Sequence, residues 1–163
     1  DEGLLLTFPQ ATHYVQRVQW EWALAPSDRD KASYIPDNYL PLREHEKLAL
    51  LDGDTELFPG LFLRVVNGHT FGQQIVELID GARSLVYCAD LVPMSAHVPA
   101  PYIMGYDLQP FVTLQEKQHI LHTAATRGDV LVFEHDPGVE AARITRDIKG
   151  FRVEKGGGVE DVL

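Results

Sequence analysis

Three short segments of this sequence carry side chains that bind metal ions, and each follows an apolar run. His69 comes after LFLRVV, Asp90 after SLVYCA, and His135 after VLVF. Two imidazoles and a carboxylate form a ligand set suited to zinc, manganese or iron. Each residue alone is a weak signal, because a lone histidine or aspartate at a strand end is usually structural. Their repeated occurrence in the same context predicts a metal centre.

Such a centre indicates a particular chemistry. A bound divalent cation lowers the pKa of its water ligand, so that hydroxide forms near neutral pH. Hydroxide attacks a carbonyl or phosphoryl centre, and an open coordination position stabilises the developing oxyanion. No serine or cysteine nucleophile is needed. The single cysteine, Cys88, lies in an apolar run and is interpreted as a buried structural thiol.

Most of the chain reads as short strands. Strands are predicted over residues 11–16, 47–51, 55–58, 61–67, 74–79, 84–89, 129–136, 141–148 and 151–155. The DGD at 52–54 indicates a hairpin turn between two of them. Loops at the ends of such strands are held rigidly, which is where functional residues usually lie.

Two longer helices are also predicted. Residues 17–25 have helical spacing, and the clearest helix covers 113–128, with Thr113 and Glu116 as a capping box and Gly128 as its end. The order of strands, helix, strand and strand predicts an α+β layered fold. We expect one domain over 1–163, with a frayed tail at 156–163.

Residues 92–110 are rich in proline and aromatic residues and predict an ordered loop beside the metal centre. Its side chains suit a pocket for a small, partly apolar substrate. Plain loop packing is an equally good interpretation. The candidate pocket residues are His97, Tyr102, Met104 and Tyr106. Asp107 is either a carboxylate that orients a metal ligand or a turn residue, and the turn is favoured.

Composition excludes several classes of function. The 163 residues carry a formal net charge of -10, which argues against binding to nucleic acid or to an anionic membrane. No stretch approaches the roughly 18 consecutive apolar residues of a membrane span. One cysteine cannot form an internal disulfide. These features predict a cytoplasmic protein with a small-molecule substrate, and leave a homodimer open.

The segments that carry the three candidate ligands resemble a known family. GHTFGQQ is similar to the Gly-His-Thr-x-Gly signature of the metallo-β-lactamase-fold hydrolases. VYCADLVP resembles the segment with their metal-bridging aspartate, and FEHDP the segment with their last metal-binding histidine. The resemblance extends from about Thr12 to Phe151, and it is strongest to the branch with lactonase-like and organophosphate-hydrolase-like members.

This resemblance implies a four-layer αββα sandwich with two divalent metal ions, zinc first and manganese or iron as alternatives. By position, His69 would bind one metal and His135 the other. Asp90 would bridge both and is the implied catalytic residue. Thr70 and Gln73 would contact the ligands from behind. Gln73 stands where many relatives have a histidine.

The family's His-x-His-x-Asp-His motif is absent, because His13 and His45 precede His69 as isolated residues. The chain is therefore expected to be the C-terminal portion of the fold, inactive alone, with the missing N-terminal half as its partner. The expected function is a metal-dependent hydrolase of a small ester, lactone or phosphotriester. The alternative is a non-catalytic fragment or interaction module of the same fold.

Overall fold

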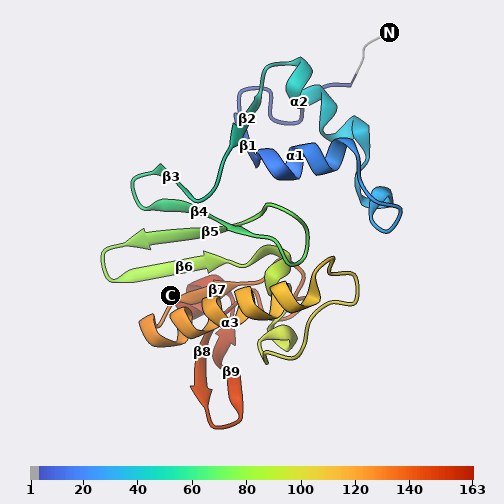
Figure 1. Cartoon of the computed structure of the whole chain (residues 1–163). Helices are drawn as coiled ribbons and strands as arrows, with labels where there is room; N and C mark the ends of the chain where they lie inside the picture. Colours follow the sequence, from blue (N-terminus) through green and yellow to red (C-terminus); the bar gives the residue numbers. More distant parts are fainter. Residues whose placement is uncertain (1–3) are drawn as a thin grey trace. The chain divides into compact units, whose positions relative to one another are not determined.

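The computed structural model describes residues 4–163, and the chain divides into two compact units between Gly53 and Asp54. Figure 1 shows the elements of each unit. The single domain expected over 1–163 stays a prediction. No helix among residues 4–163 has the length and apolar character needed to cross a membrane.

The first unit is built around two short strands and two helices. Strand β1 (His13–Gln16) pairs in parallel with β2 (Leu48–Leu51). Between them lie α1 (Arg17–Leu24), the 3-10 turns η1 (Lys31–Ser33) and η2 (Pro36–Asn38), and α2 (Leu40–Glu44). The buried Trp20 ring meets Tyr39 edge-on at 5.6 Å. The hairpin predicted at 52–54 is wrong, because β2 pairs with β1 instead of the strand that follows it.

The second unit contains a seven-stranded sheet in sequence order. Its strands are β3 (Thr55–Phe58), β4 (Leu61–Val66), β5 (Gln73–Asp80), β6 (Arg83–Tyr87), β7 (Val130–Val132), β8 (Ala141–Asp147) and β9 (Gly150–Gly157). Every neighbouring pair is antiparallel except β6 and β7, which are parallel. A parallel pair needs a crossover connection. Here the crossover contains η3 (Ala89–Leu91), η4 (Ser95–His97) and the helix α3 (Pro110–Arg127), which Figure 1 labels.

The core of this unit lies where α3 packs on one face of the sheet. Alternate strand residues face the helix, so that Ile75 is fully buried while Leu78, on the opposite face, is 43% exposed. Leu121 of α3 joins Ile75 in the main hydrophobic cluster, which also contains Cys88. The interpretation of Cys88 as a buried thiol is confirmed. The helix α4 (Val159–Val162) packs Val162 against Val130 in a second cluster.

The structure confirms the α+β class, with local differences from the expected elements. Helix α3 begins at Pro110. Proline is tolerated at the first helical position because a backbone N–H there would have no intrahelical acceptor, so its absence costs no hydrogen bond. The helix ends, as predicted, at Gly128, whose φ of 74° is left-handed. The tail at 156–163, expected to fray, instead completes β9 and forms α4.

Candidate metal centre

The three predicted ligands lie together at one edge of the seven-stranded sheet. The Nε2 of His69 is 3.5 Å from Oδ2 of Asp90, and the Nε2 of His135 is 3.2 Å from Oδ1 of the same carboxylate. The topology explains this convergence. The parallel strands β6 and β7 both end at this edge, and β5, antiparallel to β6, begins there. The connections that follow β4, β6 and β7 therefore meet.

The connection that carries His69 is fixed by the start of α3. The amides of Asn67 and Gly68 donate to the two carboxylate oxygens of Glu116 at 2.8 and 2.9 Å. Glu116 therefore does not close the capping box that we predicted. A Cβ on Gly68 would lie 2.3 Å from the Thr113 nitrogen, so glycine is required there by the close approach of two backbones.

The imidazole of His69 is oriented by Asp107. Its Nδ1 lies 2.8 Å from Oδ1 of Asp107, which is 3% exposed. Asp107 is thus the orienting carboxylate, and the turn role that we favoured is secondary. A ring whose Nδ1–H is held by a carboxylate directs its Nε2 lone pair elsewhere, as metal-binding histidines do. Burial alone would lower the pKa of His69, but the hydrogen bond to Asp107 and the charges of Asp90 and Glu134 outweigh it and raise that pKa.

A strained residue turns Asp90 out of its strand. Strand β6 ends at Tyr87, and Ala89 has a φ of 44°, in the left-handed region that non-glycine residues avoid. Such conformations persist where the surrounding structure enforces them, and they are concentrated at functional sites. Ala89 is itself buried. The strained turn places the Asp90 carboxylate between the two imidazoles.

The His135 segment is tied to the loop after Asp90. The His135 amide donates to the Pro93 carbonyl at 3.0 Å. Asp136 accepts from the amide and the hydroxyl of Ser95 at 2.9 and 2.5 Å, and from the Gly138 amide at 3.0 Å. The Ser95 hydrogen bond, aided by these amides, lowers the pKa of Asp136 to about 2. The carboxylate of Asp136 therefore joins two loops of the site.

Glu134 is a further candidate ligand that we did not select from the sequence. Asp90, Glu134 and His135 each offer a ligand atom, and these atoms lie within 4.8 Å of one another. Burial, together with a hydrogen bond to Glu134, raises the pKa of Tyr87 to about 12. The only sequence signal for Glu134 was its position next to His135, after an apolar strand.

The donor set fits a divalent cation. Imidazole nitrogen and carboxylate oxygen are the donors that zinc, manganese and iron accept. The raised pKa of His69 shows that the carboxylates make this edge of the sheet favourable for positive charge. Each oxygen of Asp90 faces an imidazole nitrogen, so both oxygens lie among the candidate donor atoms.

The four predicted pocket residues differ in their exposure to solvent. The ring of Tyr106 lies edge-on to His69, with 6.5 Å between centroids, and is largely exposed. Tyr102 is also exposed, while His97 and Met104 are half-buried. Their role in a substrate pocket stays a prediction. The Oε1 of Gln73 is buried without a hydrogen-bond partner among the described residues. Roles for Gln73 and the half-buried Thr70 behind the ligands also stay predictions.

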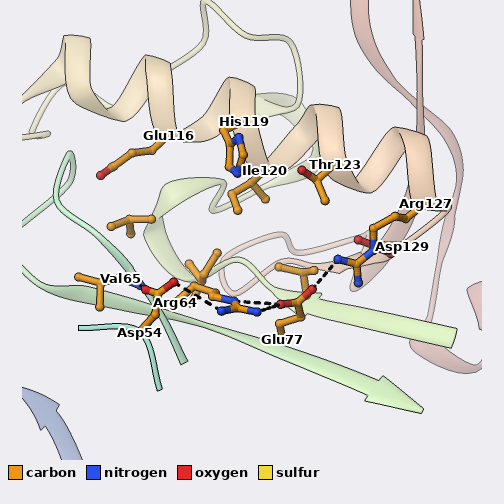
Figure 2. Close-up of a pocket in the computed structure, with 13 residues that line it drawn as sticks. Asp54, Arg64, Val65, Glu77, Glu116, His119, Ile120, Thr123, Arg127 and Asp129 are labelled. Atoms are coloured by element: carbon orange, nitrogen blue, oxygen red, sulfur yellow. Dashed lines mark hydrogen bonds and ion pairs between the residues drawn. The ribbon is translucent and has the colours of Figure 1, made fainter. Parts of the chain in front are cut away.

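A cavity of about 360 Å³, away from the candidate ligands, lies between α3 and strands β4 and β5 (Figure 2). Ion pairs cross its floor, as Figure 2 shows: Glu77 is 3.0 Å from Arg64 and 2.8 Å from Arg127. Arg127 also contacts Asp129 at 3.2 Å, and Arg64 contacts Asp54 at 3.5 Å. Each of these charged side chains is paired with one of opposite sign, so we assign the cavity a structural role.

Comparisons with known proteins give one family model and several solved structures that match this chain. The model of the metallo-beta-lactamase superfamily matches residues 3–135. A probable metal-dependent hydrolase from Staphylococcus aureus shares 25% identity, with a TM-score of 0.81. The dizinc quorum-quenching lactonase AidC (20% identity) and the hydrolase AbOPH (19%) each give a TM-score of 0.76 and show the same fold. No curated protein sequence gives a significant match.

The matched structures are longer than this chain. The alignment to the Staphylococcus aureus hydrolase covers 96% of this chain and 55% of that protein. Those to AidC and AbOPH each cover 94% of this chain and 57% of the other. The chain thus spans just over half the length of these proteins.

Proposed function

Because the chain belongs to the metallo-beta-lactamase superfamily, we propose that it forms part of a metal-dependent hydrolase. One observation carries the proposal: the two oxygens of Asp90 each face the Nε2 of an imidazole, at 3.5 Å for His69 and 3.2 Å for His135. In this proposal Asp90 lies between two divalent ions, with His69 on one and His135 on the other. Zinc suits the donors best, and manganese or iron are also compatible.

The proposed substrate is a small ester, lactone or phosphotriester. Divalent ions bound here would acidify water and supply hydroxide for attack on its carbonyl or phosphoryl centre. The residues of this chain hold the geometry. Asp107 keeps the proton of His69 on Nδ1, and Asp136 locks the His135 segment against Ser95. Tyr106, exposed beside His69, is placed to contact an approaching substrate.

We propose that the remaining metal ligands come from a further segment of the fold, outside this sequence. The matched structures support this proposal, because the chain covers only 55–57% of their lengths. The sheet supports it too. Leu78, Leu85 and Val76 share the face opposite α3, and Leu78 is 43% exposed there. We propose that the further segment packs against this apolar face.

The test is metal analysis of a protein that carries this chain together with that segment, combined with esterase, lactonase and phosphotriesterase assays. We expect about two divalent ions per chain, and loss of both metal and activity in His69→Ala and in His135→Ala. His119→Ala is the matched control, because His119 is exposed on α3 and is not a candidate ligand. No bound metal and full activity in His69→Ala would overturn the proposal. The chain would then be interpreted as a non-catalytic interaction module.

A further inference from the structure

Lys117 is a fully buried charged side chain in the middle of α3. It lies on the inward face of the helix with Thr113, Leu121 and Ala124, all buried. A core position between such residues normally carries an apolar side chain, because burying an ammonium group is costly unless its donors are satisfied. The acceptors of its hydrogen bonds therefore indicate which part of the structure the buried ammonium group holds in place.

All three donors of the ammonium group go to one short stretch of chain. Its Nζ lies 3.0 Å from the carbonyl oxygen of Pro99, 3.3 Å from that of Ala100 and 2.6 Å from that of Tyr102. An ammonium has three N–H groups, so the set is complete. Because the Tyr102 amide also donates to the Pro99 carbonyl at 3.0 Å, Lys117 closes a turn from the inside.

This turn leads directly to Asp107. The amide of Asp107 donates to the Met104 carbonyl at 3.2 Å, so a second turn follows the first. After it, the amide of Leu108 donates to the carbonyl of His69 at 3.1 Å. The chain from 99 to 108 therefore runs from the Lys117 ammonium to the backbone of His69. The Asp107 carboxylate lies on that path, 2.8 Å from Nδ1 of His69.

The charge of Lys117 also acts on the loop electrostatically. It acts on Asp107, whose negative charge partly opposes the lowering of the Lys117 pKa by burial. It acts on His97 as well: burial and then the Lys117 charge lower the pKa of that imidazole. The Nδ1 of His97 is buried without a hydrogen-bond partner among the described residues. Lys117 is thus the cation at the centre of this loop.

We infer that Lys117 is a positioning residue for the metal centre: its ammonium group fixes the 99–107 loop, and through it Asp107 aims the His69 imidazole. The inference rests on the proposed function for its catalytic meaning. The structural alternative is that Lys117 merely fills space under the loop. The two differ in what happens to His69 when the three hydrogen bonds are removed.

The experiment replaces Lys117 with methionine, which keeps the length of the side chain and removes its charge and donors. Leu121→Ala is the matched control. Leu121 is fully buried one turn further along the same face, but it belongs to the hydrophobic core. This control reproduces a loss of core packing but leaves in place the three hydrogen bonds from Lys117 to the 99–107 loop. Lys117→Arg restores the charge with a different donor geometry. All variants are made in the protein that also carries the proposed further segment.

The first measurement uses the metal-free protein. We expect at least tenfold faster amide hydrogen exchange in 99–107 for Lys117→Met, beyond any change in the sheet, and no such selective change for Leu121→Ala. At a pH above the raised pKa of His69, where the ring is neutral, nitrogen NMR should show the Nδ1–H tautomer in the wild type and a mixture in Lys117→Met. Lys117→Arg should recover part of both signals.

The second measurement is chelator competition for zinc. We expect Lys117→Met to bind zinc about tenfold more weakly, the lower end of the range for residues that orient ligands. A protein that binds no zinc in its wild-type form would overturn the proposed function, whereas the metal-free measurements would still decide the inference. If Lys117→Met and Leu121→Ala gave the same exchange rates in the loop and the same His69 tautomer, Lys117 would be a packing residue and the inference would be wrong.

Discussion

At the scale of single residues, the metal centre depends on side chains that touch its candidate ligands from behind. His69 is held by Asp107, and the loop of His135 is held by Asp136. Both contacts bring a carboxylate to a group that carries a hydrogen, so each fixes an orientation as well as a distance. These carboxylates are the residues to alter when orientation is to be changed and the ligands kept.

Asp107→Asn tests the orienting contact. The amide can still occupy the site, but it no longer offers a charged acceptor to the His69 Nδ1–H. We expect metal affinity to fall by about 10- to 100-fold, the range found for groups that orient metal-binding histidines. Chelator competition in the metal-loaded protein measures it. Asp147→Asn, at the exposed end of β8, is the control. Equal affinity in both variants would show that Asp107 does not orient His69.

Gly68→Ala tests the close approach between the His69 segment and α3. An added Cβ would lie 2.3 Å from the Thr113 nitrogen, so one backbone must move. We expect a loss of about 1–3 kcal/mol in the free energy of unfolding, as for overpacked interiors, measured by urea denaturation. Gly138→Ala is the matched control, because an added Cβ there meets nothing within 4 Å. A Gly68→Ala protein as stable as Gly138→Ala would show that the His69 segment can move away from α3 at little energetic cost.

Lys117 predicts a dependence of stability on pH. Burial lowers its pKa to about 8 from the ordinary 10.5 that the unfolded chain retains. Between these values the unfolded state binds more protons, so the free energy of unfolding rises with pH. The contribution of this residue approaches about 1.4 kcal/mol per pH unit within the window, and it is flat below pH 8.

The measurement compares urea denaturation of the wild type and Lys117→Met across this window. The wild type should gain stability relative to the variant as the pH rises above 8. Asp107 and His97 are the titratable groups that face this ammonium. Parallel pH profiles for the two proteins would show that the three carbonyl oxygens hold the Lys117 pKa near its ordinary value.

At the scale of the elements, the ion pairs between α3 and the sheet join strands β4 and β5 to the helix (Figure 2). Glu77 is central, because its carboxylate contacts both Arg64 and Arg127. Its side chain is only 10% exposed, so its charge is screened by water far less than a surface charge.

Glu77→Gln should therefore destabilise the protein. The amide keeps the shape but leaves two guanidinium groups without their shared anion. Because these groups are partly exposed, we expect a loss of about 1–2 kcal/mol rather than the larger cost of a fully buried pair. Asp80→Asn on the same strand is the control, since its pair with Arg83 is exposed and worth little. Equal midpoints of urea denaturation for the two variants would contradict the prediction.

The elements themselves were largely predictable from the sequence, whereas their pairing was not. The strands of the second unit are apolar runs between turn residues, and His69, Asp90 and His135 stand out because each follows such a run. The parallel partner of β2 is β1, a pairing that no local pattern indicates. For the same reason the sequence left Asp107 between an orienting carboxylate and a turn residue, because its partner His69 lies 38 residues away.

At the scale of the whole molecule, the proposed catalytic protein is larger than this chain. The chain's contribution to its metal centre is the set of candidate ligands at one edge of the seven-stranded sheet. The family assignment followed from GHTFGQQ and the two later segments, and the superfamily match over residues 3–135 confirms it. The substrate could not be predicted in the same way, because the likeness to the lactonase AidC and the hydrolase AbOPH is a likeness of fold. Recognition of a substrate depends on loop side chains such as Tyr106, which the fold does not dictate.

The one parallel pair in the large sheet has a consequence for the order of folding. Strands β3 to β6 are successive neighbours, whereas β6 ends at Tyr87 and its partner β7 begins at Val130. Pairing across that interval requires closure of a long loop, and non-local contacts slow folding. Pulsed amide exchange during refolding should therefore protect β5 before β7. The two imidazoles meet only after that slow closure, so zinc in the refolding buffer should leave the early protection of β5 unchanged.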